Sequence, residues 1–199
     1  MAPPATVERA AVTLAEYLAF ERDAAEKHML WDGEIFKAWA MSGGSPAHNT
    51  ISANAIGAFY VALRCGRCRV MTSDQNVWIP RKNGIVYPDV TVVCGRVELL
   101  EGTTDVVTNP SVIVEVLSPS TETFDRIDKF AGYRSVASLR HYVMVSSTGT
   151  LVERYARGDD GGWTLWEHGA GDVFTLSSPE VSMRVDELYA GAFDERIGD

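Results

Sequence analysis

The apolar run SVIVEVL at residues 111–117 constrains the fold of this chain more than any other segment. A nearly unbroken apolar run is typical of a central strand that is covered on both faces. Side chains alternate along a strand, so Glu115 shares one face with Ile113 and Leu117 while the valines take the other. Burying an ionised carboxylate is costly unless it is paired or binds a metal, so Glu115 is the first candidate functional residue.

Asp89 is a second acid inside a segment with strand composition, VYPDVTVV at residues 86–93. Asp is depleted in strands, and Pro88 lacks a backbone donor, which indicates a sheet edge, a strand start or a bulge. If the two strands are neighbours, Asp89 and Glu115 converge and offer the oxygen ligands that suit Mg²⁺ or Mn²⁺. A core ion pair explains either acid alone, but both acids together, with Lys129 downstream, favour a metal site.

The segment that follows the apolar run carries further polar side chains. A helix is predicted from about residue 122 to residue 136, and the four-residue spacing of Asp125, Lys129 and Tyr133 places them on one face. The alternative is an ordinary surface ion pair between Asp125 and Lys129. The connecting loop at residues 118–121 has hydroxyls and free N–H groups that suit a phosphate, and helix capping is the commoner explanation for them.

The order of predicted elements is that of an α/β (α+β) domain built around one mixed sheet. A capping-box pattern at residues 13–16 predicts a helix that ends near residue 27. A hairpin follows at residues 29–40 with Asp32-Gly33 as its turn, and then a second helix at residues 47–64. The other predicted strands lie at residues 69–72, 76–79, 86–93, 111–117, 141–146 and 152–156. The C-terminal part is predicted to be rich in strands and to end in a short helix near Glu187.

The length of 199 residues fits a single domain over residues 1–199, of which the first twelve are expected to form a flexible N-terminus. No membrane-spanning run or signal peptide is recognisable, so a cytoplasmic location without membrane contact is expected. Three cysteines cannot close a disulfide framework and fit a reducing compartment. Cys65 and Cys68 have the spacing of half a zinc site, but zinc is not favoured, because only Cys94 remains to complete it.

The net charge of -9 is an objection to a nucleic-acid partner, because non-specific binding needs clustered Lys and Arg. A local basic groove is the alternative to a broad basic surface. Two short groups of cations in the sequence could form it: Arg64, Arg67 and Arg69, and Arg81 with Lys82. Solvated charges beside a turn are the simpler interpretation of each group taken alone.

Three motifs together resemble the Uma-type restriction endonucleases of the PD-(D/E)XK nuclease superfamily. They are Tyr-Pro-Asp-Val, then Val-Ile-Val-Glu-Val-Leu-Ser-Pro-Ser-Thr, and then Asp125-x-x-x-Lys129-x-x-x-Tyr133. Upstream, Asp32-Gly33-Glu34, Met41-Ser42 and His48 match the N-terminal pattern of the same family. The resemblance covers about residues 13–156 and is specific in combination, although no single motif is.

The resemblance implies a restriction-endonuclease-like core in which Asp89 and Glu115 are metal ligands and Lys129 is the catalytic lysine. The lysine that the superfamily pattern places two residues after the second acid is Leu117 here. In this family the role is transferred to the following helix, where Lys129 lies. Glu34 could complete the acidic cluster, or it could be a solvent-exposed hairpin residue.

The expected activity is hydrolysis of nucleic-acid phosphodiester bonds, DNA above all, with Mg²⁺ or Mn²⁺ as cofactor and the carbonyl of Val116 as a third protein ligand. His48 would contact a phosphate or a carboxylate, or it is simply an early residue of the second helix. A homodimer would let two sites cut two strands. The alternative is a non-catalytic member of the fold that acts as a nucleic-acid-binding or scaffold protein, which the acidic charge favours.

Overall fold

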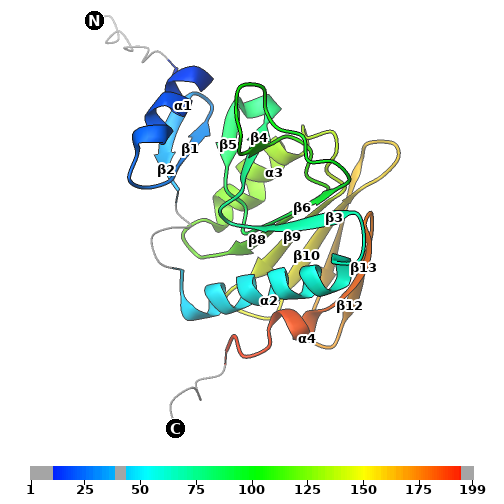
Figure 1. Ribbon diagram of the computed structural model, residues 1–199. Helices are drawn as coiled ribbons and strands as arrows, with labels where there is room; N and C mark the ends of the chain where they lie inside the picture. Colours follow the sequence, from blue (N-terminus) through cyan, green and yellow to red (C-terminus); the bar gives the residue numbers. More distant parts are fainter. Residues whose placement is uncertain (1–10, 39–43, 194–199) are drawn as a thin grey trace, which may run out of the picture.

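A computed structural model describes residues 11–38 and 44–193 (Figure 1). Its largest element is a six-stranded sheet in the order β11-β10-β9-β8-β6-β3. The strands are β3 (Cys68–Thr72), β6 (Val90–Cys94), β8 (Val112–Leu117), β9 (His141–Ser146), β10 (Val152–Arg157) and β11 (Trp163–His168). Strand β8 pairs with β9 in parallel and with β6 in antiparallel orientation, and all its residues are buried. The central strand predicted from the apolar run is confirmed.

A second sheet of five strands has the order β2-β1-β5-β4-β7. Its strands are β1 (His28–Trp31), β2 (Glu34–Lys37), β4 (Asn76–Ile79), β5 (Gly84–Val86) and β7 (Val106–Val107). The predicted hairpin is β1-β2, and its turn residues Asp32 and Gly33 have φ angles of 49° and 79°. Both central residues of a type I′ turn need positive φ, which is why Asp-Gly suits this turn.

The prediction of one strand over residues 86–93 is wrong. The chain leaves β5 at Val86, passes through Tyr87-Pro88-Asp89, and enters β6 at Val90 in the other sheet. Pro88 has no N–H for a ladder, so the continuous apolar pattern is interrupted between the two sheets. The single mixed sheet expected from the sequence is therefore divided into two, and Asp89 lies where the chain crosses between them.

Three helices and a hairpin complete the layers. Helix α2 (Pro46–Leu63) covers one face of the six-stranded sheet through Ile51, Ala55 and Phe59, which pack against the valines of β6 and β8. The hairpin β12 (Val173–Ser177) and β13 (Glu180–Arg184) and the short helix α4 (Val185–Leu188) belong to the same core. Helix α1 (Leu14–Asp23), with the predicted capping box of Thr13 and Glu16, packs Tyr17 on Leu30 and Ile85 of the five-stranded sheet.

The core between the two sheets contains Ile113 and Leu117 from β8 and Val77, Ile79 and Trp31 from the five-stranded sheet. Glu115 shares the face of Ile113 and Leu117, so its side chain enters this layer. The described helices include none that is long and apolar enough to cross a membrane.

The helix predicted after β8 has an unexpected geometry. Residues Phe124–Lys129 form a π-helical segment, in which the N–H of Phe130 donates to the carbonyl of Asp125, and α3 (Phe130–Tyr133) continues it. A π-helical turn in the middle of a helix is rare and is frequent at functional sites. It begins seven residues after the last residue of β8.

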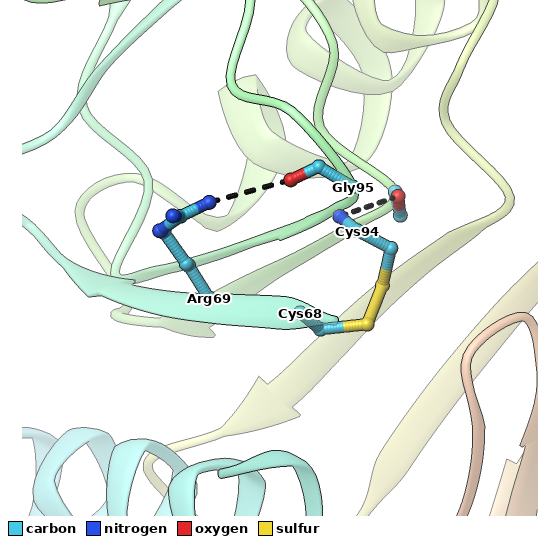
Figure 2. Close-up of a disulfide and its surroundings, with 5 residues drawn as sticks. Cys68, Arg69, Cys94 and Gly95 are labelled. Atoms are coloured by element: carbon cyan, nitrogen blue, oxygen red, sulfur yellow. Dashed lines mark hydrogen bonds between the residues drawn. A yellow bond between two sulfur atoms is a disulfide. The ribbon is translucent and has the colours of Figure 1, made fainter. Parts of the chain in front are cut away.

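A disulfide joins two of the three cysteines, which the sequence did not predict. Cys68 and Cys94 are directly opposite in the antiparallel pair β3-β6, with their Cα atoms 3.9 Å apart, and they form a disulfide (Figure 2). The spacing of Cys65 and Cys68 suggested half of a zinc site. The register of β3 and β6 instead places the Cys68 thiol next to that of Cys94. Cys65 is exposed and free, so the half zinc site is absent from the described residues.

Candidate active site

A cavity of about 240 Å³ opens at the C-terminal end of β8. It lies between the crossing segment of Asp89, the start of α2, and the π-helical segment. The polar side chains that line it are Ser45, His48, Asp89, Glu115, Ser118, Ser120, Thr121, Asp125, Lys129 and Ser147. The structure therefore brings together five acids or bases that the sequence singled out, in one pocket.

Asp89 and Glu115 face each other across two neighbouring strands. Val90 pairs with Val114 at the end of the β6-β8 ladder, so the antiparallel register places Asp89 opposite Glu115. Asp89 Oδ2 accepts a hydrogen bond of 2.7 Å from the backbone N–H of Val116. Both side chains are nearly buried, with exposed fractions of 7% for Asp89 and 3% for Glu115.

Lys129 occupies the centre of the acidic cluster. Its Nζ donates to Glu115 Oε1 at 3.0 Å and lies 2.8 Å from Asp125 Oδ1. The hydroxyl of Tyr133 donates to the same Glu115 oxygen at 2.7 Å. The i,i+4 pair of Asp125 and Lys129 is thus buried rather than a surface ion pair.

Burial dominates the protonation of this cluster. It raises the pKa of Glu115 to about 8, against the attraction of Lys129 and with the repulsion of Asp125 and Asp89. Burial also raises the pKa of Asp89, although His48 and the Val116 N–H act in the opposite direction. For Lys129, burial alone would lower the pKa, but the nearby Glu115 and Asp125 outweigh it and hold the pKa above its ordinary value. Near neutral pH, Asp89 and Glu115 together therefore carry less negative charge than two fully ionised carboxylates would.

The residues fit a divalent cation. The hydrogen bonds described above use Asp89 Oδ2 and Glu115 Oε1, and the other oxygen of each carboxylate has no hydrogen-bond partner among the described residues. The N–H and C=O of one strand residue point to the same side, so the Val116 carbonyl faces the side of Asp89 as well. Two carboxylates and one carbonyl form an oxygen donor set of the kind that Mg²⁺ and Mn²⁺ take.

His48 lies in the pocket wall at the start of α2. Ser45 caps this helix by accepting from the His48 N–H at 3.2 Å, which places the imidazole on the first turn. Its Nε2 is 3.7 Å from Asp89 Oδ2, so the imidazole is close to a carboxylate, one of the two contacts expected of it.

Glu34 does not join the acidic cluster. It is exposed at the start of β2, opposite Trp31, and does not line the cavity. Its position is that of the solvent-exposed hairpin residue considered as the alternative. The Met41-Ser42 motif lies outside the described residues.

Two lining residues, Ser147 and Met29, gave no signal in the sequence. Ser147 follows β9 and donates its backbone N–H to the Leu117 carbonyl, which brings it beside the end of β8. Met29 and Tyr87 form an apolar wall from the five-stranded sheet and the crossing segment. Ser147 reaches the pocket only because β9 pairs in parallel with β8. The sequence of neither strand shows which strand will be its partner, so the position of Ser147 could not be predicted.

Comparison with known proteins matches the chain to relatives over most of its length. The family model described as "Uma2: Putative restriction endonuclease" matches residues 14–186. Two uncharacterized proteins of Synechocystis sp., slr1290 and sll1609, are 38% and 33% identical, over 88% and 78% of this chain and 90% and 86% of theirs. The crystal structure of a "putative nuclease belonging to DUF820" from Anabaena variabilis superposes with a TM-score of 0.70 at 14% identity, over 92% of this chain and 99% of that one. That likeness shows a shared fold.

Proposed function

The chain belongs to the Uma2 family, described as "Putative restriction endonuclease", and from this membership we propose that it is a divalent-metal-dependent nuclease. The reaction is hydrolysis of phosphodiester bonds in nucleic acid, with DNA as the first substrate to test. The observation that carries the proposal is the meeting of Asp89, Glu115 and Lys129 in one buried pocket. Structural ion pairs alone would not require two acids opposite each other on adjacent strands.

Asp89, Glu115 and the Val116 carbonyl would hold Mg²⁺ or Mn²⁺, which when bound supplies a Lewis acid and a water of lowered pKa. Lys129 keeps its positive charge in the pocket and offers it to the negative charge that develops on the phosphate. Asp125 positions the Lys129 ammonium, and Tyr133 positions the Glu115 carboxylate. The burial of these side chains limits their contact with bulk water, which strengthens each of these interactions.

Cleavage assays with and without Mg²⁺ or Mn²⁺ test the proposal directly. Asp89→Ala and Glu115→Ala are expected to abolish cleavage, and Lys129→Met to slow it by about 10²-fold or more. Glu34→Ala is the matched control, because it removes an acid of the same chain that lies outside the pocket. Metal-independent cleavage, or cleavage that survives both acid substitutions, would refute the mechanism.

A non-catalytic nucleic-acid-binding or scaffold protein is the second candidate, and the net charge of -9 favours it. Calorimetric titration with Mn²⁺ separates the two. Mn²⁺ binding that Asp89→Ala abolishes, together with no cleavage of any substrate, would indicate a metal-binding scaffold. The homodimer expected from the sequence stays a prediction, which sedimentation would check.

A further inference from the structure

We infer that the pocket acts on a flexible single strand of nucleic acid rather than on a continuous duplex. The inference rests on the proposed nuclease function and names the substrate class of the same site. It follows from the depth of the pocket, from the pairing of its cations and from the place of the free arginines.

The carboxylates are nearly buried where they line the pocket. Asp89 and Glu115 are 7% and 3% exposed, and the cavity that they line has a volume of about 240 Å³. A phosphate must enter this cavity to reach them. The backbone of a duplex is held in a regular helix by stacking and pairing, whereas a single strand can bend one phosphate inward without breaking base pairs.

The cations beside the pocket are already paired within the described structure. Lys129 contacts two carboxylates of the pocket. Arg126, on the same helix, pairs with Glu122 and with Glu153. A duplex is normally held by neutralising many phosphates at once, and a row of unpaired cations for that is missing from the described pocket rim.

The arginines without a carboxylate partner in the described structure include a group at the opposite end of the sheet. Arg157 donates to the carbonyl of Arg134, and its own N–H bonds the carbonyl of Arg140. The N–H of Arg140 bonds the carbonyl of Ser111, which precedes β8, whereas the pocket begins at Glu115. Ser111 and Glu115 are four residues apart along the strand, which is roughly 13 Å at about 3.3 Å per residue. None of the three arginines lines the pocket.

The pocket instead offers neutral donors and an apolar wall. Four of its hydroxyl side chains belong to the loops that follow β8 and β9: Ser118, Ser120, Thr121 and Ser147. Met29, Tyr87 and Phe124 line the same cavity. Hydroxyls can bind phosphate oxygens without counterion release, and the half-buried ring of Phe124 can stack on an unpaired base of any sequence. Both features suit a short unpaired stretch.

The expected salt dependence separates the two substrate classes. With one or two phosphates neutralised, the slope of log K against log salt is about -1 for a single strand, against about -6 or steeper for a protein that tracks a duplex. Fluorescence anisotropy with a labelled single strand and the same strand in a duplex measures both slopes, in Mn²⁺ and with Asp89→Ala as control.

Cleavage of the same labelled strand, alone or fully paired, is the second measurement. The unpaired strand is expected to be cut at least about tenfold faster, because the duplex must first be opened. Arg134→Gln and Arg140→Gln, both exposed, are expected to leave binding and cleavage unchanged.

The outcomes are distinguishable. Equal cleavage of the duplex, a steep salt slope, or weakened binding in the two arginine variants would overturn the single-strand inference and leave the nuclease proposal intact. Absence of any Asp89-dependent cleavage would remove the nuclease proposal, and the anisotropy comparison would still decide between single strand and duplex.

Discussion

Three carboxylates and one ammonium share the pocket, so the charge on each of these residues depends on the others. Lys129 is held by Glu115 and Asp125 and stays protonated, whereas burial favours the neutral form of Glu115. A divalent cation would reverse this preference by displacing the proton. Metal binding is accordingly expected to release protons near neutral pH.

Glu115→Gln tests this electrostatic arrangement through stability. The pKa of Glu115 is raised from its ordinary value to about 8, so the folded protein holds this proton more tightly than the unfolded chain. The stabilisation is complete below about pH 4.5 and is lost as the pH rises to about 8. Urea unfolding without metal should therefore show falling stability across this window, and the slope should be smaller in Glu115→Gln. Equal slopes for the two proteins would contradict the raised pKa.

Lys129→Met should destabilise the protein by about 3–5 kcal/mol near pH 8, because two buried carboxylates lose their cation. Adding Asp125→Asn should restore part of this loss, since one of the stranded charges is then removed. Arg184→Met is the control, because Arg184 and Glu187 form an exposed pair. Denaturant midpoints of these proteins and of Asp125→Asn alone complete the comparison, and strictly additive losses would show that Lys129 and Asp125 do not interact.

At the residue scale, the sequence identified the acids for a physical reason. Asp89 and Glu115 stand out because acids are costly in strands, and Lys129 because it follows at helical spacing. Ser147 and Met29 have no such contrast with their neighbours, so only the fold brings them to the pocket. Glu34 is the opposite case, because it belongs to a motif that matches the family but does not line the pocket.

At the scale of elements, the π-helical segment and α3 fit tightly under the five-stranded sheet. A Cβ atom on Gly132 would lie 2.7 Å from Trp31 Cη2 and 2.8 Å from Ile79 Cγ2. Gly132→Ala is therefore expected to destabilise by about 1–3 kcal/mol through overpacking. In the exposed part of α2, a Cβ on Gly57 would meet nothing within 4 Å, so Gly57→Ala should stabilise by about 0.5–1 kcal/mol. Thermal unfolding of both variants checks the opposite signs, and a neutral Gly132→Ala would contradict the close approach.

The boundaries of elements were predictable where a local signal exists. The Thr13 cap, the Asp32-Gly33 turn and the buried strand β8 all depend on interactions within a few residues. The π-helical geometry and the change of sheet at Pro88 depend on what packs against the segment. A continuous apolar pattern is satisfied equally by one long strand and by two short strands in different sheets.

The disulfide between Cys68 and Cys94 limits how far the whole chain can extend when the protein unfolds. The two cysteines are 26 residues apart, and closing a loop of this size stabilises by about 3 kcal/mol in the chain-entropy model. Reduction, or the double substitution Cys68→Ala and Cys94→Ala, should lower the urea midpoint accordingly. Cys65→Ser is the control, because it leaves the disulfide intact. Alkylation of the unreduced, unfolded protein at all three cysteines would show that the bond is absent.

The same bond has a mechanical consequence. The loop from Cys68 to Cys94 leaves the six-stranded sheet, passes through β4 and β5 of the other sheet, and returns with Asp89 on its way. A force that pulls on the two chain ends would be carried by the disulfide bond and not by the loop between the two cysteines. The fully stretched chain would be shorter, by roughly 90 Å at about 3.4 Å per residue, than the same chain without the disulfide. The segment that joins the two sheets and carries the first pocket acid would stay free of load until the disulfide is reduced.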